Sequence, residues 1–343
     1  MSSEEKVSFS ITEPRFDLNT YWGRVNSIAA GTAFRNAFKT KAQIQEMQKL
    51  VADQKAREAE QFQKTGSYQM QMSQEEKQQL CLAQDIVNAT VHPDTNEALP
   101  WIMRISSFMP MNIPLNIGFI LAPPTIFNTV SVHVANQSYN AIMNYGNANA
   151  SSPYTSQDIG RSYASAVAAS VGVSLLIRQI NAKRSAAATG ARLIMLNAIT
   201  STIACMCGGF ANNWCMRMVE MERGIELCDP DTGEPIGKSP KCAKAAVLQT
   251  ASSRILMAMP VALPAFALLG IEKLGMMPKS PFLSVPLQIG LICGQLTFAV
   301  PLSMGAFPQI ATIKASELEP EFQGLRSKLK GELITEFKYN KGL

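Results

Sequence analysis

Amide side chains are concentrated in a segment that carries no charged residue. From Ile105 to Gln157, 53 residues pass without an Asp, Glu, Lys or Arg. Within this segment Asn136, Asn140 and Asn144 recur at intervals of four, and His133 precedes them by three residues. This spacing places the four side chains on one face of a helix. Amides in hydrocarbon are costly unless they have partners, so the stripe is predicted to face the protein interior or a wet cavity.

Two interpretations of this polar stripe are open. The first is a path for a polar substrate beside a membrane-spanning helix, and the second is an amphipathic helix at the membrane interface. Prolines interleaved with the amides favour the first, because broken helices often hold the substrate in transporters. The candidate substrate-binding residues are the polar side chains of this segment, namely Asn112, Asn116, His133, Asn136, Gln137, Asn140 and Asn144.

No arrangement typical of an enzyme or a metal site is present in the sequence. There are two histidines, His92 and His133, and there is no CxxC, HExxH or phosphate-binding loop. Cys205 and Cys207 flank one methionine without further ligands nearby. The seven cysteines are odd in number and four fall in apolar runs, which suits reduced packing residues. The sequence therefore predicts no catalysis, no cofactor and no metal site.

The overall composition indicates a membrane protein. Charged residues make up 17% of the 343 residues and apolar residues 47%, whereas charged residues make up roughly 25% of a typical soluble domain. The first 104 residues hold 25 of the 57 charges. This distribution argues against a soluble enzyme, a disordered chain and a disulfide-rich secreted domain. The net charge of +5, without a Lys/Arg run, argues against nucleic-acid binding.

The gaps between charged residues are long enough for membrane-spanning helices, which need about 20 apolar residues each. We predict an all-α polytopic membrane protein with about five transmembrane helices. A helical extramembrane region is predicted at 1–104, a transmembrane domain at 105–313 and a C-terminal tail at 314–343. The spans are predicted near residues 111–133, 160–177, 193–216, 255–271 and 282–306.

Two helices of the extramembrane region are predicted from their capping signals. Thr40 with Gln43 and Ser73 with Glu76 each match a capping box, and apolar residues follow at helical spacing. The polar segment 63–71 between them is predicted to be a loop. Both helices are expected to pack on the membrane domain or on a partner.

Charge asymmetry predicts the orientation in the membrane. Segment 178–192 carries four basic residues and no acidic one, whereas segment 134–161 carries one of each. The positive-inside rule places 178–192 and the N-terminus on the cytosol-like side, which is the matrix in a mitochondrion. The acidic Glu4 and Glu5 at the N-terminus are typical of neither a signal peptide nor a presequence, so no cleavable presequence is expected.

A turn-forming block stands before the predicted membrane domain, and further blocks follow along the chain. The turn is His92, Pro93, Asp94, Thr95, Asn96 and Glu97. The other blocks are ITEPRFDLNTYWGR at 11–24, RISSFMPMN at 104–112, NQSYNAIMNY at 136–145, SRILMAMP at 253–260, AFPQ at 306–309 and the terminal NKGL. Together, and in this order, they resemble the sideroflexin family, the tricarboxylate-carrier-like proteins of mitochondria.

The resemblance implies a multi-pass protein of the inner mitochondrial membrane that carries small neutral amino acids. Serine, entering the matrix for one-carbon metabolism, is the leading substrate of the family. The resemblance adds Ser138 and Tyr145 to the candidate binding residues. It also marks a family turn motif, formed by His92, Pro93, Asp94, Thr95 and Glu97.

Two details of the turn motif bear on its structure. Asn96 replaces the usual glycine, but asparagine also adopts left-handed backbone conformations, so the turn is expected to survive. A similar turn sequence, PDTGE at 230–234, is interpreted as a coincidence rather than as a repeat.

The residues favour a neutral amino acid over citrate. A tricarboxylate would require several cations in the pathway, and the candidate arginines lie at the ends of the predicted spans. Alternating access without hydrolysis is the expected mechanism. The alternatives are a structural or accessory subunit of an inner-membrane assembly, docking through 1–104, and, more weakly, tricarboxylate or iron transport. The predicted partners are an amino-acid substrate, the lipid bilayer and, for the accessory subunit, an inner-membrane complex.

Overall fold

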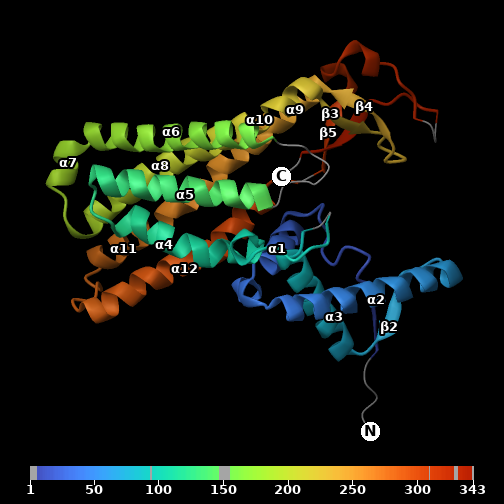
Figure 1. The fold of residues 1–343 in the computed structure, drawn as a ribbon, viewed down its shortest axis with the longest axis horizontal. Helices are drawn as coiled ribbons and strands as arrows, with labels where there is room; N and C mark the ends of the chain where they lie inside the picture. Colours follow the sequence, from blue (N-terminus) through green and yellow to red (C-terminus); the bar gives the residue numbers. More distant parts are fainter. Residues whose placement is uncertain (1–5, 93–94, 147–154, 309, 328–330, 342–343) are drawn as a thin grey trace, which may run out of the picture. The chain divides into compact units, whose positions relative to one another are not determined.

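The computed structural model describes residues 6–92, 95–146, 155–308, 310–327 and 331–341, without the side chains of Asn144 and Ser185. The fold is mainly α-helical (Figure 1). It divides into two compact units, each built from three segments of the chain. The first unit comprises Met1–Pro114, Tyr139–Pro153 and Leu296–Ala306, and the second comprises Leu115–Ser138, Tyr154–Gln295 and Phe307–Leu343.

Four helical segments of the described chain are long and apolar enough to cross a membrane. They confirm the predicted all-α polytopic membrane fold. The segments are α6 (Ser156–Ile180), α8 (Gly190–Met216), the run Pro240–Lys273 and α12 (Pro281–Gly305). The run Pro240–Lys273 consists of α10 (Pro240–Ala258), the 3-10 turn η4 (Met259–Ala262) and α11 (Leu263–Lys273), and the short α7 (Ala182–Ala186) joins α6 to α8.

The span predicted near 111–133 is wrong as a single helix. Within it α4 (Phe108–Leu121) ends and α5 (Ile126–Gly146) begins. Pro123 and Pro124 lie between the two helices. They interrupt the helix because proline has no backbone N–H to donate and disfavours a helical conformation at the residue before it. The 14 residues of α4 are too few to cross a bilayer. The 21-residue α5 is long enough, but its polar residues keep it out of the four candidate spans, so a fifth crossing stays a prediction.

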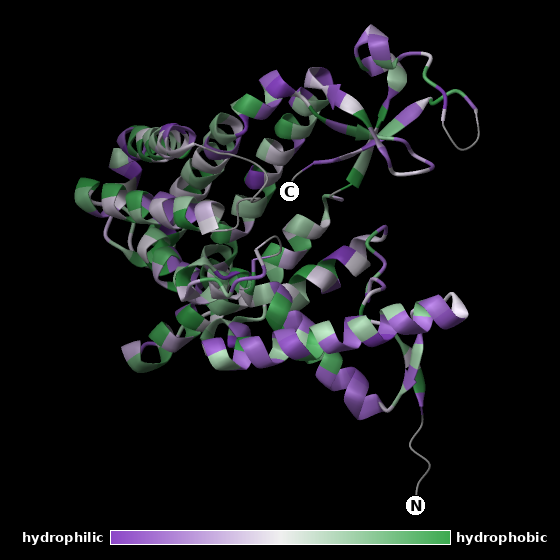
Figure 2. Cartoon of the chain, turned by 45° about the vertical axis from the view of Figure 1, so that its right-hand side comes forward, coloured by the Kyte–Doolittle hydropathy of each residue, from purple (hydrophilic) through white to green (hydrophobic). Residues whose placement is uncertain are grey.

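The N-terminal part of the first unit is a small helical layer with one strand pair. Both predicted capping boxes are present, at Thr40 before α2 and at Ser73 before α3. The loop predicted at 63–71 is wrong at both ends, since α2 continues to Thr65 and β2 begins at Met70. Figure 2 shows α2 as largely hydrophilic, in contrast to the helices of the second unit. The elements are β1 (Val7–Phe9), α1 (Tyr21–Gly31), α2 (Lys41–Thr65), β2 (Met70–Met72) and α3 (Gln74–Thr90), with β1 and β2 antiparallel.

A buried carboxylate fastens the segment after β1 to α2. Glu58 is fully buried, and its oxygens accept hydrogen bonds from the Ser10 hydroxyl (2.7 Å) and the backbone N–H groups of Ile11 (2.9 Å) and Thr12 (3.0 Å). Gln54 Nε2 donates a fourth at 3.1 Å. Burial alone would raise the pKa of Glu58, but these hydrogen bonds to the ionised form outweigh it and hold the pKa below its ordinary value.

We expect Glu58→Gln to destabilise the first unit by about 2–3 kcal/mol, because an amide cannot accept all four hydrogen bonds. Since the pKa of Glu58 is lowered by folding, its stabilising contribution is present above the pKa of the unfolded chain, about 4.3, and is lost as the pH falls through the folded value. Thermal unfolding followed by circular dichroism between pH 7 and pH 3 measures both effects. Glu60→Gln, which changes an exposed carboxylate on the same helix, is the matched control. A Glu58→Gln protein with wild-type stability and pH dependence would contradict this role.

Much of the C-terminal tail predicted at 314–343 is folded into a sheet of the second unit. The antiparallel sheet has the strand order β4-β3-β6-β5. Its strands are β3 (Ile225–Cys228), β4 (Pro235–Ser239), β5 (Ile310–Lys314) and β6 (Glu336–Asn340). In β6, Phe337 and Tyr339 are buried while their neighbours are exposed, which is the period of two expected of a half-buried strand. Phe337 and Tyr339 pack in one cluster with Leu227 of β3 and with Cys242 and Ala246 of α10.

Two turns of similar sequence have the same backbone hydrogen bonds. In the turn motif, His92 N–H donates to Glu97 O and Asn96 N–H donates to His92 O, both at 2.9 Å. At 229–234, Asp229 N–H donates to Glu234 O and Gly233 N–H donates to Asp229 O, again both at 2.9 Å. The PDTGE sequence at 230–234 therefore resembles the turn motif in these backbone hydrogen bonds as well as in composition.

The fifth residue of each turn has a left-handed backbone. Its φ is 54° at Asn96 and 72° at Gly233, which confirms that asparagine can replace the usual glycine there. The same two backbone hydrogen bonds occur without the PDT sequence, from Ser327 N–H to Glu332 O and from Gly331 N–H to Ser327 O, with Gly331 at φ 69°. The turn motif itself lies in the first unit, and its Pro93 and Asp94 are outside the described residues.

Candidate functional site

In the interior of the second unit, the helices α6 and α8 and residues 126–138 of α5 bring polar side chains together. In Figure 1, α5, α6 and α8 run side by side. On α6 the buried residues Ser162, Ser170 and Ser174 are spaced by four or eight, and Arg178 continues this face. The α8 helix contributes a face of the same kind. We call the following set the polar core: His133, Asn136 and Gln137 of α5, Ser170, Ser174 and Arg178 of α6, and Asn197, Ser201 and Asn212 of α8.

Contacts along the polar core join the three helices at several levels. At one end, Arg178 Nη1 donates to Asn197 Oδ1 at 3.1 Å. Farther along, Asn136 Nδ2 lies 4.0 Å from the Cys205 sulfur. Beyond it, the hydroxyls of Ser138 and Tyr163 are 3.1 Å apart. The polar side chains therefore run along the helices rather than forming one isolated cluster.

Gly208 allows the three helices to approach closely in the middle of the polar core. A Cβ atom at this position would lie 2.5 Å from Gln137 Nε2, 2.9 Å from Ser170 Cβ and 3.2 Å from the backbone oxygen of Ala166. Real Cβ atoms essentially never make contacts as short as the first two. Glycine is thus required for the present packing of α8 against α5 and α6.

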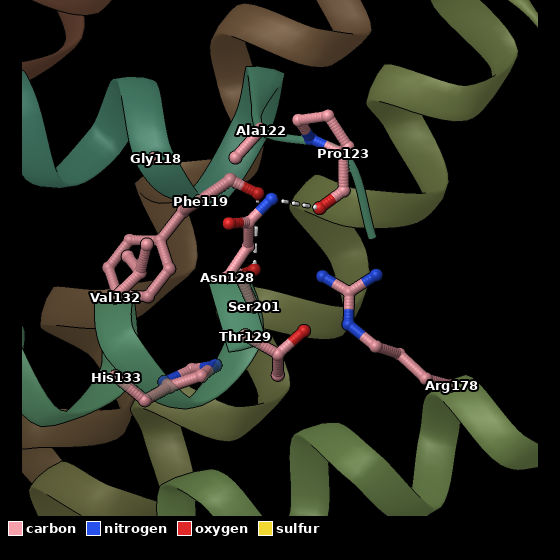
Figure 3. Close-up of a pocket in the computed structure, with 10 residues that line it drawn as sticks. All are labelled: Gly118, Phe119, Ala122, Pro123, Asn128, Thr129, Val132, His133, Arg178 and Ser201. Atoms are coloured by element: carbon pink, nitrogen blue, oxygen red, sulfur yellow. Dashed lines mark hydrogen bonds between the residues drawn. The ribbon is translucent and has the colours of Figure 1, made fainter. Parts of the chain in front are cut away.

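A small pocket lies at the Arg178 end of the polar core (Figure 3). It leaves about 10 Å³ for the centre of a water molecule, roughly what one bound water needs. In Figure 3 the guanidinium group of Arg178 extends from α6 toward the loop at Pro123. The pocket is lined by Gly118, Phe119, Ala122, Pro123, Asn128, Thr129, Val132, His133, Arg178 and Ser201.

His133 is the most unusual residue of this pocket. Its side chain is 1% exposed, and among the described residues neither ring nitrogen has a hydrogen-bond partner. The ring packs against Phe119, with the two centroids 4.9 Å apart. Arg178 Nε and the hydroxyl of Ser174, one turn before it, also lack partners in this part of the chain. Buried polar atoms without partners are costly, so their concentration here indicates room for a polar ligand or water.

Backbone oxygens at the end of α4 form the opposite wall of the pocket. Phe119 O accepts from Ser201 Oγ at 3.3 Å, and Ala122 O accepts from Asn197 Nδ2 at 3.4 Å. Pro123 O accepts from Asn128 Nδ2 at 2.9 Å. The C-terminal end of a helix carries a partial negative charge. The pocket therefore places a cation, Arg178, opposite a wall rich in carbonyl oxygens.

The predicted binding residues are divided between the two units. His133, Asn136, Gln137 and Ser138 meet α6 and α8 in the second unit, which also contains the buried Asn116. Asn112, Asn140 and Tyr145 belong to the first unit. Asn112 donates back to Phe108 O within α4 at 2.8 Å, and Tyr145 is 64% exposed. The Asn144 side chain is outside the described residues.

The turn motif takes no part in the polar core. His92 is buried in the first unit, whereas Thr95 and Glu97 are exposed there. Thr95 N–H lies 3.4 Å from His92 Nδ1, and Glu97 N–H lies 3.4 Å from the Thr95 hydroxyl. These contacts give the motif's side chains a role in holding the turn.

Sequence reasoning missed the residues that α6 and α8 contribute. Ser170, Ser174 and Arg178 recur every four residues, and Asn197 and Ser201 do the same, so the signal was present in both helices. Serine is common on small-residue packing faces, which hid the pattern in α6. Across the described residues, no group of three or more His, Cys, Asp or Glu side chains is placed to hold a metal ion.

Comparison with known proteins covers nearly the whole chain. A family model described as "Sideroflexins" matches residues 10–343. The chain is similar to a sideroflexin of Dictyostelium discoideum, with 31% identity over 100% of both chains. It is also similar to human sideroflexin-1, with 31% identity over 100% of both chains, and to sideroflexin fsf1 of Schizosaccharomyces pombe, with 32% identity over 96% of this chain and 97% of that protein. No solved structure matches the chain.

Proposed function

The chain belongs to the sideroflexin family of transporters, and from this premise we propose that it carries a small neutral amino acid, first of all serine, across the inner mitochondrial membrane. In this proposal serine reaches the matrix for one-carbon metabolism. The observation that carries it is the pocket where Arg178 and the unpartnered His133 face the carbonyl end of α4.

This pocket matches the charge distribution of an amino acid. The carboxylate of the substrate would accept charge-assisted hydrogen bonds from Arg178. Its ammonium group would lie against the carbonyl oxygens of Phe119, Ala122 and Pro123 at the negative end of α4. His133 offers two ring nitrogens for the serine hydroxyl or for a water beside it. Arg178 is the single charged residue among those that line the pocket, which disfavours a tricarboxylate.

The size of the pocket supports alternating access. Space for about one water is too small for serine, so the structure corresponds to a closed state of the proposed site. Admission of a substrate requires α5, α6 and α8 to separate at one end of the polar core. Rocking of helices around a fixed site is a common way for transporters to do this.

The membrane and the orientation belong to the same proposal. We place the N-terminus and the basic segment 178–192 on the matrix side, supported by the positive-inside rule. Arg178 lies in this segment, so the pocket would be at the matrix end of the polar core.

Uptake of labelled serine into liposomes that carry the purified protein tests the proposal. We expect saturable uptake that excess unlabelled alanine inhibits and that citrate and ferrous iron leave unchanged. Inhibition by citrate would instead support tricarboxylate transport. A folded protein that takes up none of these solutes would contradict transport and would support the accessory-subunit alternative.

A further inference from the structure

A second arginine of the second unit lies in a candidate membrane span without an acidic partner. Arg254 is on α10, within the candidate span Pro240–Lys273 and directly before its uncharged stretch 255–271. It is half-buried, and its Nη1 lies 3.4 Å from the Met257 sulfur, which is a weak acceptor. No carboxylate in the described part of the chain pairs with it. A charge at such a position is costly and is typically found where it meets a partner or a ligand.

The two fully buried arginines of the described chain have strong acceptors. Arg104 donates to the backbone oxygens of Leu99 (2.9 Å), Ala37 (2.8 Å) and Lys39 (2.8 Å). Arg217 donates from Nε to Glu220 at 2.9 Å and from Nη1 to the Thr250 hydroxyl at 2.8 Å. Arg254 is therefore a cation whose donors are available to a ligand.

The surroundings of Arg254 hold further polar groups. Thr250, one turn before it on α10, donates to Asn213 Oδ1 of α8 at 3.1 Å. A Cβ atom at Gly209 of α8 would lie 3.3 Å from Arg254 Cβ, so the arginine packs directly on this helix. The Thr250 hydroxyl is already bonded to Arg217 and Asn213, and Glu220 pairs with Arg217, so Arg254 is the cation of this group that is left for an anion.

Arg254 and Arg178 contact α8 at different levels. Arg178 bonds to Asn197, and Gly209 lies twelve residues farther along the helix. At 1.5 Å per residue this separation is about 18 Å, a large part of the roughly 30 Å hydrocarbon core of a bilayer. The two cations therefore lie toward opposite ends of one membrane helix.

We propose that Arg254 is a second binding station for the substrate carboxylate, reached from the membrane face opposite to that of Arg178. This inference rests on the proposed function and extends it to the route of the substrate. The carboxylate would contact Arg254 on one side of the membrane and Arg178 in the closed pocket. The polar core between them would accommodate the uncharged parts of the solute.

The test measures serine transport in both directions in vesicles where protease accessibility shows a single orientation of the protein. Arg254→Gln is expected to raise KM about tenfold from one face and to leave KM from the other face within about twofold. Arg254→Lys should raise KM less, because it keeps the charge and loses the planar fork. Arg192→Gln, which removes an exposed arginine of α8, is the matched control and should leave both values unchanged.

Two results for Arg254→Gln would overturn the inference. One is an unchanged KM at both faces of the membrane. The other is an equal rise in KM at both faces, which a purely structural role of Arg254 would give. If Arg254→Gln does not fold, the two-sided KM of Arg254→Lys decides the question. A change in KM seen with anionic lipid but absent in vesicles of pure phosphatidylcholine, whose headgroup has no net charge, would assign Arg254 to an anionic lipid headgroup. Absence of transport by the wild-type protein is a separate result, since it removes the proposed function itself.

Discussion

Arg178→Gln is expected to lower kcat/KM for serine uptake by about 100-fold, because the variant loses the cation that meets the substrate carboxylate. A hydrogen bond to a charged group contributes about 1.5–3 kcal/mol, and about 2.7 kcal/mol corresponds to a factor of 100. In the structure Arg178 donates to Asn197, while its Nε has no partner among the described residues. Initial rates of labelled serine uptake across a range of concentrations measure the effect.

The control variants for Arg178 separate binding from folding. Arg178→Lys keeps the charge and should retain part of the activity, since lysine cannot reproduce the planar fork of arginine. Arg184→Gln removes an exposed cation from the same basic segment and should leave uptake unchanged. If folded Arg178→Gln transports serine within about threefold of wild type, Arg178 is not the carboxylate site of the proposed transporter.

Gly208→Ala is expected to destabilise the second unit by about 2 kcal/mol, in the range found for overpacked cores. The added methyl group would collide with Ser170 and Gln137, and neither has free space because both are buried. In an open helical position the same change normally stabilises by up to about 1 kcal/mol. The midpoint of thermal unfolding in detergent, together with serine uptake, measures the effect.

Gly172→Ala is the matched control for Gly208→Ala. Gly172 lies on α6, and a Cβ atom there would have no neighbour within 4 Å. We expect this variant to be as stable as the wild type or more stable. If Gly208→Ala and Gly172→Ala unfold at the same temperature, α8 does not pack on α5 and α6 as closely as described above.

The parts of the fold that depend on local sequence were predictable. The capping boxes at Thr40 and Ser73 use side chains within four residues of the backbone they bond, so their signal is complete in a short window. The helices that contain four of the predicted spans were likewise visible from uninterrupted apolar sequence. The sheet was not, because β3 pairs with β6 from a distant part of the chain and each of its strands has only four or five residues.

The candidate site was predictable on one helix and hidden on the other two. His133, Asn136 and Gln137 stood out because their segment contains no charge at all. Arg178 was interpreted as an orientation signal at the end of a span, since its sequence gives no sign that it turns toward α4 and α5. Asn140 and Asn144 follow Asn136 on the same helix face, but a helical period cannot show where one compact unit ends and another begins.

The polar face of α5 has a consequence for how the chain enters the bilayer. A segment inserts on its own when it is apolar enough, and α5 does not reach the hydropathy of the four candidate spans. Its contacts with Tyr163 and Cys205 come from α6 and α8, which follow it in the chain. As the predicted fifth span, α5 would therefore depend for its retention in the membrane on helices that are made after it. We expect the three helices to insert together, because a chain that ends before α8 lacks the Cys205 contact of Asn136.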